Sequence, residues 1–543
     1  MHIDKKLFLT NLQSGVTVSL ISIPLSVSLA VASNASPTVG ILTAMWAGLM
    51  AAIFGGSHYN IVGPTGALSG IIAVFVITQG AALLPSLAVV TGLIVLLSYF
   101  LRLERYLIFV PGSVIHGFTL GVAFIIGLNQ LNGALGLTGL KQHPEFVANI
   151  KESLVHLGNT SMSALGIFLL FLAGLLLFKK YVPKLPGAIF LAPVGIFLGY
   201  LSEKGLISLD LITLGEKFTD ISFKLIEVSH FTWNIEILKT ALVVALVAIL
   251  ETMLSAKIAD GMTQTKYNER HEMLGLSMAN IVVGLFGGMP ATAALARTAL
   301  NVKTGATNRL SGIINSVSVA VIAAFFLSSF QFIPLPVVSA ILVFVAIGMI
   351  EKGHFERLWL ADRPSFWVAL LVALVTILID PMYGILIGVA VALLLFVRKI
   401  TEGPCDVKLN SSEKGLLAEG RDEDEIKHIK EDADIALYSF RGKLCYLNSK
   451  THLSRFENGF RDYKTIILRL KEVDFIDMDG VEVFDEIVRL LEKRGQKVLV
   501  TGVFDPVEAV LDQLSHTYED LKNNSLVFTK TTEALASLGI RTE

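Results

Sequence analysis

The chain has 543 residues, of which 53% are hydrophobic and only 17% are charged. Soluble domains carry about a quarter charged residues, so this composition excludes an ordinary soluble protein. The charge is concentrated in the tail, because residues 401–543 hold 20 Lys and Arg and 28 Asp and Glu, against totals of 44 and 46. The sequence therefore predicts a membrane part over residues 1–400, followed by a part that lies in water.

A helix needs about 20 mostly apolar residues to cross the hydrocarbon core of a membrane. Lys5 and Lys6 precede the first apolar stretch as in a signal peptide, but further apolar segments follow without a pause, so we interpret this stretch as a first membrane helix. Segments 64–78 and 291–301 are too short to span as ordinary helices. In all, fourteen segments are predicted, at 11–32, 36–54, 64–78, 82–101, 106–130, 161–178, 185–202, 234–257, 273–287, 291–301, 308–328, 335–350, 365–379 and 382–398.

The basic residues predict the orientation of these segments. If the N-terminus lies inside, pairs such as Arg102 with Arg105 and Arg398 with Lys399 fall in inner loops, whereas the short outer loops contain no Lys or Arg. This is the positive-inside pattern, and it predicts a cytosolic N-terminus and a cytosolic tail at the inner (plasma) membrane. The two cysteines, both in the tail, argue against a disulfide framework.

The two short segments begin alike. The first reads G-P-T-G-A-L-S-G from Gly63 to Gly70, and the second reads G-G-M-P-A-T-A-A-L-A-R from Gly287 to Arg297. Pro suits the first turn of a helix, and Gly lets the preceding chain turn. Each segment alone would indicate a kink in an ordinary helix. As a pair, in corresponding places of two seven-segment halves, they predict half-helices that meet at the midplane site of a transporter.

Half-helices that start within the membrane direct free N–H groups and a positive dipole end into the protein, which makes an anion site. Arg297 would add a full positive charge to that site. Glu251 lies in the middle of the eighth span, and Ser255 follows one turn later on the same face. An acidic residue there indicates an ion pathway or a proton relay, and the alternative is a structural partner that neutralises Arg297.

Other residues give weaker signals. We interpret His116, Asn129 and Asn280 as packing residues or interhelical hydrogen-bonding residues. The sequence contains nothing that resembles a metal cluster, a Walker loop or a nucleophile elbow. It therefore predicts no enzyme activity, no catalytic residues, no cofactor besides a coupling ion, no metal site, no ATP-driven transport and no nucleic-acid partner.

The tail divides into two parts. Residues 401–432 are polar and charged and are interpreted as a linker with a surface element. Residues 433–543 alternate strand-like and helix-like runs, which predicts a small α/β domain with helices against a sheet. Strands are predicted at 435–440, 444–447, 465–470 and 497–501, and helices near 449–460, 479–494, 505–515 and 531–538.

Several ordered motifs carry a resemblance to a known family. I-P-L-S-V-S-L-A, G-G-S-H-Y-N and V-G-P-T-G lie between residues 15 and 70, I-A-D-G-M-T-Q-T-K-Y-N lies at 258–268, and G-G-M-P-A-T-A-A-L-A-R-T lies at 287–298. Together they resemble SulP-family (solute carrier family 26) anion transporters, and the tail resembles the STAS domain that ends members of this family. The resemblance covers nearly the whole chain and is closest to the bacterial branch with dicarboxylate and bicarbonate carriers.

The resemblance implies a polytopic α-helical fold with a seven-plus-seven inverted repeat and a small cytosolic STAS domain. Spans 1–4 and 8–11 would form a core domain, the other spans would form a gate domain, and the protein would be a homodimer in which an elevator-like movement gives alternating access. By position, it implies an anion site formed by Thr65, Gly66, Ala67, Thr292, Ala293, Ala294 and Arg297, closed by Leu25 and Leu29.

Two departures from the family's patterns affect the expected mechanism. Sodium-coupled bicarbonate carriers of the family have an Asp where this chain has Glu251, so we expect a proton rather than sodium as the coupling ion at Glu251 and Ser255. Related stand-alone STAS proteins carry a phosphorylatable Ser where this chain has Asp479, so a phosphoserine switch is not expected there. A cytosolic partner of the STAS domain remains open.

We therefore expect secondary active symport of a small anion, such as bicarbonate, sulfate or a C4-dicarboxylate, with the proton on Glu251. One alternative is an anion exchanger or a channel-like uniporter in which Glu251 is structural, and another is a sodium-coupled symporter. A third is a sensor whose membrane part serves the STAS domain. Intact half-helices and Arg297 disfavour the sensor, and Arg297 and the STAS tail disfavour a nucleobase carrier.

Overall fold

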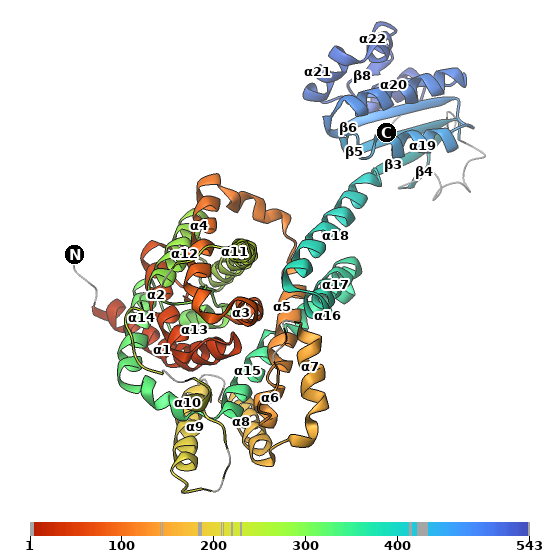
Figure 1. Cartoon of the computed structure of the whole chain (residues 1–543). Helices are drawn as coiled ribbons and strands as arrows, with labels where there is room; N and C mark the ends of the chain where they lie inside the picture. Colours follow the sequence, from red (N-terminus) through yellow and green to blue (C-terminus); the bar gives the residue numbers. More distant parts are fainter. Residues whose placement is uncertain are drawn as a thin grey trace. The chain divides into compact units, whose positions relative to one another are not determined.

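The computed structural model describes residues 5–540 except 142, 144, 183–186, 208, 210, 219–220, 228–230, 412–414 and 421–432. The chain divides into two compact units, Met1–Ala392 and Leu393–Glu543, each with its own hydrophobic core. The first unit is helical, and the second contains a sheet covered by helices (Figure 1).

Each of the fourteen predicted segments corresponds to a helix, so the predicted fold class is confirmed. In the part of the chain that the structure describes, nine helices are long and apolar enough to cross a membrane, and shorter apolar helices include α3, α9 and α17. The fourteen helices are α1 (Lys5–Ala32), α2 (Pro37–Phe54), α3 (Gly66–Gln79), α4 (Leu84–Leu101), α5 (Gly112–Leu128), α8 (Met162–Tyr181), α9 (Gly187–Glu203), α11 (Ile235–Thr263), α12 (Glu269–Leu285), α13 (Leu295–Lys303), α14 (Leu310–Phe326), α15 (Leu335–Met349), α17 (Arg363–Leu378) and α18 (Pro381–Thr401).

Among the described residues of the first unit, four further α-helices lie in the connections, where the sequence analysis predicted none. They escaped prediction because they are short and carry too many polar residues for a hydropathy signal. These are α6 (Leu131–Leu135), α7 (Phe146–Val155), α10 (Leu214–Lys217) and α16 (Lys352–Ala361).

The helices of the first unit pack in two groups. Helix α12 packs closely against both α2 and α4, and α1 packs against α14 and α11 against α4, whereas α5 packs against α15 and α17. Small residues permit the close approach: a Cβ at Gly92 of α4 would lie 2.7 Å from the Ile281 backbone nitrogen of α12. These contacts fall within spans 1–4 and 8–11 or within the remaining spans, the division that the resemblance implies, and further contacts such as α3 with α5 and α1 with α15 join the two sets.

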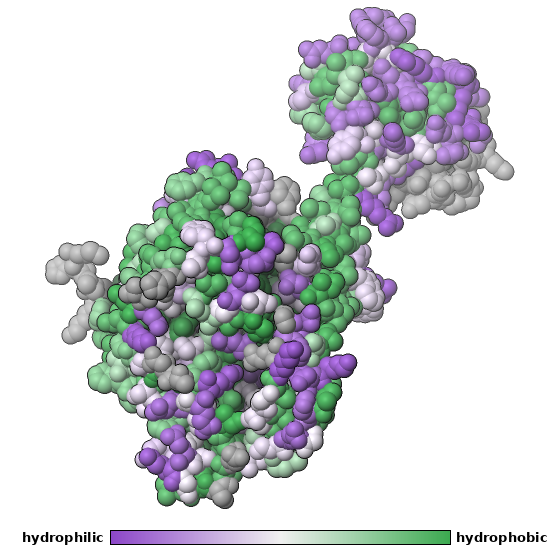
Figure 2. Space-filling view, viewed as in Figure 1, coloured by the Kyte–Doolittle hydropathy of each residue, from purple (hydrophilic) through white to green (hydrophobic). Residues whose placement is uncertain are grey.

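The outer surface of the first unit is largely apolar, as hydrophobic residues cover much of its visible face in Figure 2. Large side chains such as Leu170 and Phe325 are more than half exposed to the surroundings. Such a surface would be unfavourable in water, and it suits contact with lipid chains.

The second unit is a six-stranded sheet in the order β4-β3-β5-β6-β7-β8. Strands β5 to β8 run parallel, and β3 pairs antiparallel with both β4 and β5. The strands are β3 (Cys405–Ser411), β4 (Gly415–Gly420), β5 (Ile435–Leu444), β6 (Thr465–Ile476), β7 (Lys497–Thr501) and β8 (Val527–Phe528), and the helices are α19 (Ser449–Asn458), α20 (Met478–Lys493), α21 (Asp505–Leu514), α22 (His516–Asn523) and α23 (Thr531–Ser537).

The sheet includes part of the segment that was interpreted as a linker. Residues 405–411 and 415–420 form β3 and β4, because alternate residues of β3 such as Val407 and Leu409 are buried in the core of the second unit. The charged run at 421–425 lies outside the described residues. The strand predicted at 444–447 overlaps β5 only at Leu444, and residues 445–447 form a turn. Helix α22 and strand β8 were not predicted.

Candidate functional site

The two broken helices meet through a short pair of strands. Strand β1 (Val62–Gly63) pairs antiparallel with β2 (Thr292–Ala293), with Gly63 opposite Thr292. The half-helices α3 and α13 begin just after these strands, as the third and tenth of the fourteen helices. The structure therefore brings together Thr65, Gly66 and Ala67 of the first half with Thr292, Ala293 and Ala294 of the second.

The starts of these half-helices differ from those of their neighbours. Asn234 and Asn268 cap α11 and α12 with side-chain hydrogen bonds. By contrast, Thr65 and Ala294, which precede α3 and α13, are extended and make no side-chain cap. First-turn N–H groups without a cap, at the positive end of the helix dipole, are suited to binding an anion.

Arg297 links the two half-helices. Its side chain is 2% exposed, and its Nη2 donates a hydrogen bond to the backbone carbonyl of Pro64. A Cβ at Gly63 would lie 2.8 Å from Arg297 Nη1, so Gly63 leaves room for the guanidinium. Among the described residues, the buried Nη1 has no hydrogen-bond partner, and neither do the buried hydroxyls of Ser22 and Ser26 on α1. Arg297 therefore offers a positively charged, unpaired donor beside the start of α3.

Glu251, on α11, faces this region. Its carboxyl lies beside the Thr65 hydroxyl and within electrostatic range of the Arg297 guanidinium. The Glu251 residue is partly exposed, whereas Arg297 is buried. The structure therefore places an acidic group, a basic group and the start of α3 in one region.

The remaining predicted residues occupy different surroundings. Leu25 and Leu29 lie on α1, which contacts both α3 and α13, and they belong to the same hydrophobic cluster as Ala67. Ser255 is buried, and its hydroxyl donates to Thr298 Oγ1 at 2.9 Å. Ser255 therefore connects α11 to α13, because its hydroxyl is bonded to Thr298.

A polar network behind the strands was missed by the sequence analysis. The buried Glu272 carboxylate accepts hydrogen bonds from the backbone N–H groups of Gly56 and Ser57, both at 2.7 Å, and from Asn60 Nδ2 at 2.6 Å. The Asn60 amide also donates to the carbonyl of Thr252 on α11. The predicted span began one residue after Glu272, so Glu272 lay outside it. The polar run at 55–60 was the sequence signal that could have found this network.

The Thr292 side chain fixes the second strand. Its hydroxyl lies 2.8 Å from the Thr252 hydroxyl and donates to the carbonyl of Ala248 on α11. Asn280 of α12 bonds both the N–H and the carbonyl of Ala291, at 2.9 and 3.0 Å. Asn280 therefore supports the chain that enters the second half-helix, which agrees with its interpretation as a hydrogen-bonding residue.

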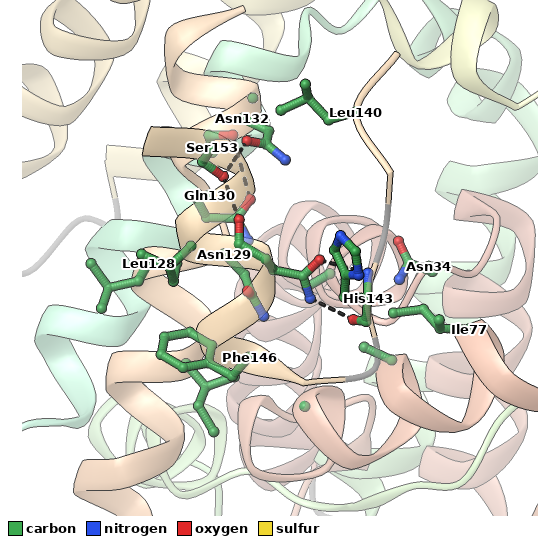
Figure 3. Close-up of a pocket in the computed structure, with 18 of the residues that line it drawn as sticks. Asn34, Ile77, Leu128, Asn129, Gln130, Asn132, Leu140, His143, Phe146 and Ser153 are labelled. Carbon is green, nitrogen blue, oxygen red and sulfur yellow. Dashed lines mark hydrogen bonds between the residues drawn. The ribbon is translucent and has the colours of Figure 1, made fainter. Parts of the chain in front are cut away.

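A polar cavity of about 390 Å³ lies along α3 (Figure 3). Its wall includes Gly70, one turn after the start of α3, and the amides of Asn34, Asn129 and Gln130. Asn132 accepts a hydrogen bond from Ser153 at 2.6 Å, which holds the wall in place. The sequence analysis interpreted Asn129 as an interhelical hydrogen-bonding residue, but the structure places it in the wall of this cavity.

The fourteen helices, the paired half-helices and the buried guanidinium between them define a polytopic membrane transporter. Residues 8–372 match the model of the sulfate permease family, and residues 427–525 match that of the STAS domain. The chain therefore belongs to the sulfate permease (SulP) family of anion transporters, and it is not an enzyme.

The chain is similar to known transporters over nearly its whole length. The chain is 30% identical over 504 residues to "Putative sulfate transporter YvdB" of Bacillus subtilis strain 168, which covers 91% of this chain and 92% of that protein. It is 24% identical over 552 residues to "Bicarbonate transporter BicA" of Picosynechococcus, with coverage of 95% and 93%.

Two solved structures share the fold. That of murine Solute Carrier 26 family member A9 in the inward-facing state covers 99% of this chain and 92% of its own, with a TM-score of 0.83 and 16% identity. The transmembrane domain of a cyanobacterial BicA covers 70% of this chain and 98% of its own, with a TM-score of 0.62 and 24% identity.

Proposed function

We propose that the protein is a proton-coupled symporter of a small anion, with bicarbonate, sulfate and C4-dicarboxylates as the candidate substrates. The observation that carries this proposal is the placement of Glu251 beside Thr65 and Arg297, where both half-helices begin. A transport site that holds a basic and an acidic group together can bind an anion and a proton in the same state.

The anion would bind between the starts of α3 and α13. The uncapped N–H groups at Gly66 and Ala67 and after Ala294 would donate hydrogen bonds, and Arg297 Nη1 would supply a charged donor. A buried donor without a partner is costly, so an oxyanion that accepts from several donors at once gains affinity there. Leu25 and Leu29 of α1 would close the site and exclude water.

The proton would bind to Glu251. An anion beside Arg297 brings a second negative charge near the Glu251 carboxylate, and protonation of that carboxylate removes the repulsion. Proton and anion would therefore bind cooperatively, and by linkage each would increase the affinity for the other by the same factor. The Ser255 hydroxyl is already bonded to Thr298, so its part in coupling would be to hold α11 against α13.

Alternating access would come from an elevator-like movement of the group that contains α1, α3, α11 and α13 against the group that contains α5, α15 and α17. Small residues and close contacts within each group favour movement of each as one body. The amide-lined cavity along α3 would provide a path to one side of the membrane. We further propose a homodimer at the inner membrane with the N-terminus and STAS domain in the cytosol, the latter open to a cytosolic partner.

The alternatives differ in what Glu251 does. In an anion exchanger or a channel-like uniporter, Glu251 would neutralise Arg297 permanently, and in a sodium symporter its carboxylate would bind Na⁺.

The substrates proposed follow the relatives, which are named as sulfate and bicarbonate transporters. The panel experiment that selects among substrates uses radiolabelled bicarbonate, sulfate and C4-dicarboxylates with purified protein in proteoliposomes. Saturable uptake of one anion supports the proposal, and uptake of none of these anions contradicts it.

A further inference from the structure

Three potential metal ligands meet away from the anion site. His116 lies in the second turn of α5, Glu351 immediately precedes α16, and His354 lies in the first turn of α16. Their ligand atoms all lie within 4.8 Å of one another. The sequence analysis expected no metal cluster, because His116 is far from the other two along the chain. The packing of α5 against α15 and α17 brings them together.

The contacts within this cluster are close. His116 Nδ1 lies 3.3 Å from Glu351 Oε2, and the rings of His116 and His354 are 3.6 Å apart at 31°. The His354 Nε2 atom is buried and has no hydrogen-bond partner among the described residues. Glu351 also makes no side-chain cap for α16, although it occupies the capping position. His354 Nε2 is therefore free to coordinate a cation, and the paired atoms of His116 and Glu351 would exchange their mutual contact for bonds to it.

We propose that His116, Glu351 and His354 form a binding site for one divalent ion of the Zn²⁺ class. Two imidazoles and one carboxylate are typical ligands of Zn²⁺, Co²⁺ or Ni²⁺, whereas Mg²⁺ and Ca²⁺ prefer oxygen ligands alone. A tetrahedral ion with bonds of about 2.1 Å holds its ligand atoms about 3.4 Å apart. Small rotations of these side chains would bring the three atoms to that spacing.

The bound ion fastens the beginning of α5 to the turn between α15 and α16. Helix α5 already packs against α15, so the ion adds a cross-link at one end of an existing interface. Water would take the fourth position, since the Glu351 side chain is 44% exposed. Arg357 lies near both Glu351 and His354, and its positive charge opposes binding of a cation.

The test is titration of the purified full-length protein, carrying no histidine tag, with Co²⁺ and with Zn²⁺. The expected result is one saturable equivalent per chain with the strong visible absorption of a tetrahedral Co²⁺ site. His116→Ala and His354→Ala should each abolish Co²⁺ binding at this site. Glu351→Gln should weaken Co²⁺ binding about tenfold or more, and Arg357→Ala should strengthen it.

The matched control is a second pair of histidines around a glutamate. His143 and His156 approach different oxygens of Glu152, at 3.8 Å each, so they do not converge on one point. The double variant His143→Ala/His156→Ala keeps the Co²⁺ site. The proposal is overturned if the parent binds no saturable equivalent of Co²⁺, or if its Co²⁺ spectrum is the weak one of an octahedral ion with oxygen ligands. It is also overturned if the His116→Ala and His354→Ala variants keep the site while their melting temperatures without metal equal that of the parent.

Discussion

Arg297, in the second half-helix, donates a hydrogen bond to the backbone carbonyl of Pro64, which precedes the first. One side chain thus joins two segments of the chain that lie in different halves of the repeat. The same guanidinium keeps its other terminal nitrogen unpaired among the described residues. In the proposed function it would therefore hold the half-helices together and bind the anion at the same time.

Replacement of Arg297 tests its role in anion binding. Arg297→Ala should weaken anion binding by on the order of 10- to 100-fold, because a hydrogen bond to a charged group contributes roughly 1.5–3 kcal/mol and each 1.4 kcal/mol is about tenfold. Binding of the transported anion to purified protein measures this. Lys303→Ala is the control, since Lys303 is an exposed basic residue of the same helix. Equal binding by Arg297→Ala and parent would remove Arg297 from the site.

Replacement of Glu272 should lower the stability of the membrane unit. Its carboxylate accepts three hydrogen bonds from the chain that leads to β1, so Glu272→Gln should destabilise the membrane unit by on the order of 2 kcal/mol. The melting temperature in detergent should fall by several degrees, an order-of-magnitude expectation for such a loss. Glu269→Gln, an exposed substitution on the same helix, should leave it unchanged. An unchanged melting temperature for Glu272→Gln would contradict this role.

The strands before residue 433 determine where the second unit can be removed. A chain ending at Gly403 loses the whole sheet, whereas a chain ending at Glu431 keeps β3 and β4 without their partner β5. An unpaired apolar strand promotes aggregation. We expect the first truncation to be monodisperse in size-exclusion chromatography and to retain some anion binding, and the second to aggregate. Identical elution profiles for the two truncated chains would show that β3 and β4 do not depend on pairing with the rest of the sheet, and would contradict this prediction.

His452 should make the stability of the second unit depend on pH. Burial, together with the nearby positive charge of Arg455, lowers the pKa of His452 to about 3, and its Nδ1 lies 2.6 Å from the Tyr438 hydroxyl. Unfolded His has a pKa of about 6.5, so below that value only the unfolded chain takes up the proton. Stability is therefore fully present above pH 6.5 and falls by about 1.4 kcal/mol per pH unit between 6.5 and 3.

Urea unfolding of a fragment that spans residues 398–543, measured by circular dichroism between pH 7 and pH 4, tests this prediction. His452→Gln keeps an acceptor for Tyr438 and should flatten the slope, while His516→Gln, whose side chain is 96% exposed, should not. Parallel slopes for His452→Gln and parent would contradict the assignment.

Much of the fold followed from local patterns. Apolar length identified fourteen helices, and the repeated Gly-Pro-Thr pattern identified the half-helices, because a broken membrane helix requires those residue types. The β1–β2 pairing and the His116 cluster could not be predicted, since they depend on contacts between segments far apart in the sequence. Strand β3 was missed because its charged residues, the partly buried Asp406 and Lys408, alternate with buried residues in a segment that is charged overall.

The site was predicted less completely than the fold. Thr65, Thr292 and Arg297 were expected together, and they lie together. Glu272 was not expected, because it lay just outside the predicted span. The polar run at 55–60 indicates a polar connection, but the sequence does not show that Glu272 packs against it. Ser255 shares a helix face with Glu251, but the Ser255 hydroxyl donates its hydrogen bond to Thr298, whose hydroxyl is the acceptor within reach.

The measurement that tests the central claim most directly is accumulation of the anion in proteoliposomes under an inward proton gradient, compared between the parent and Glu251→Gln. Gln cannot release or take up a proton, so it mimics the protonated carboxyl. The account predicts that Glu251→Gln still binds the anion, with less dependence on pH, and still exchanges anion for anion, but does not accumulate it. Accumulation by Glu251→Gln to the parental level, driven by the pH gradient alone, would contradict the account and leave Glu251 as a structural partner of Arg297.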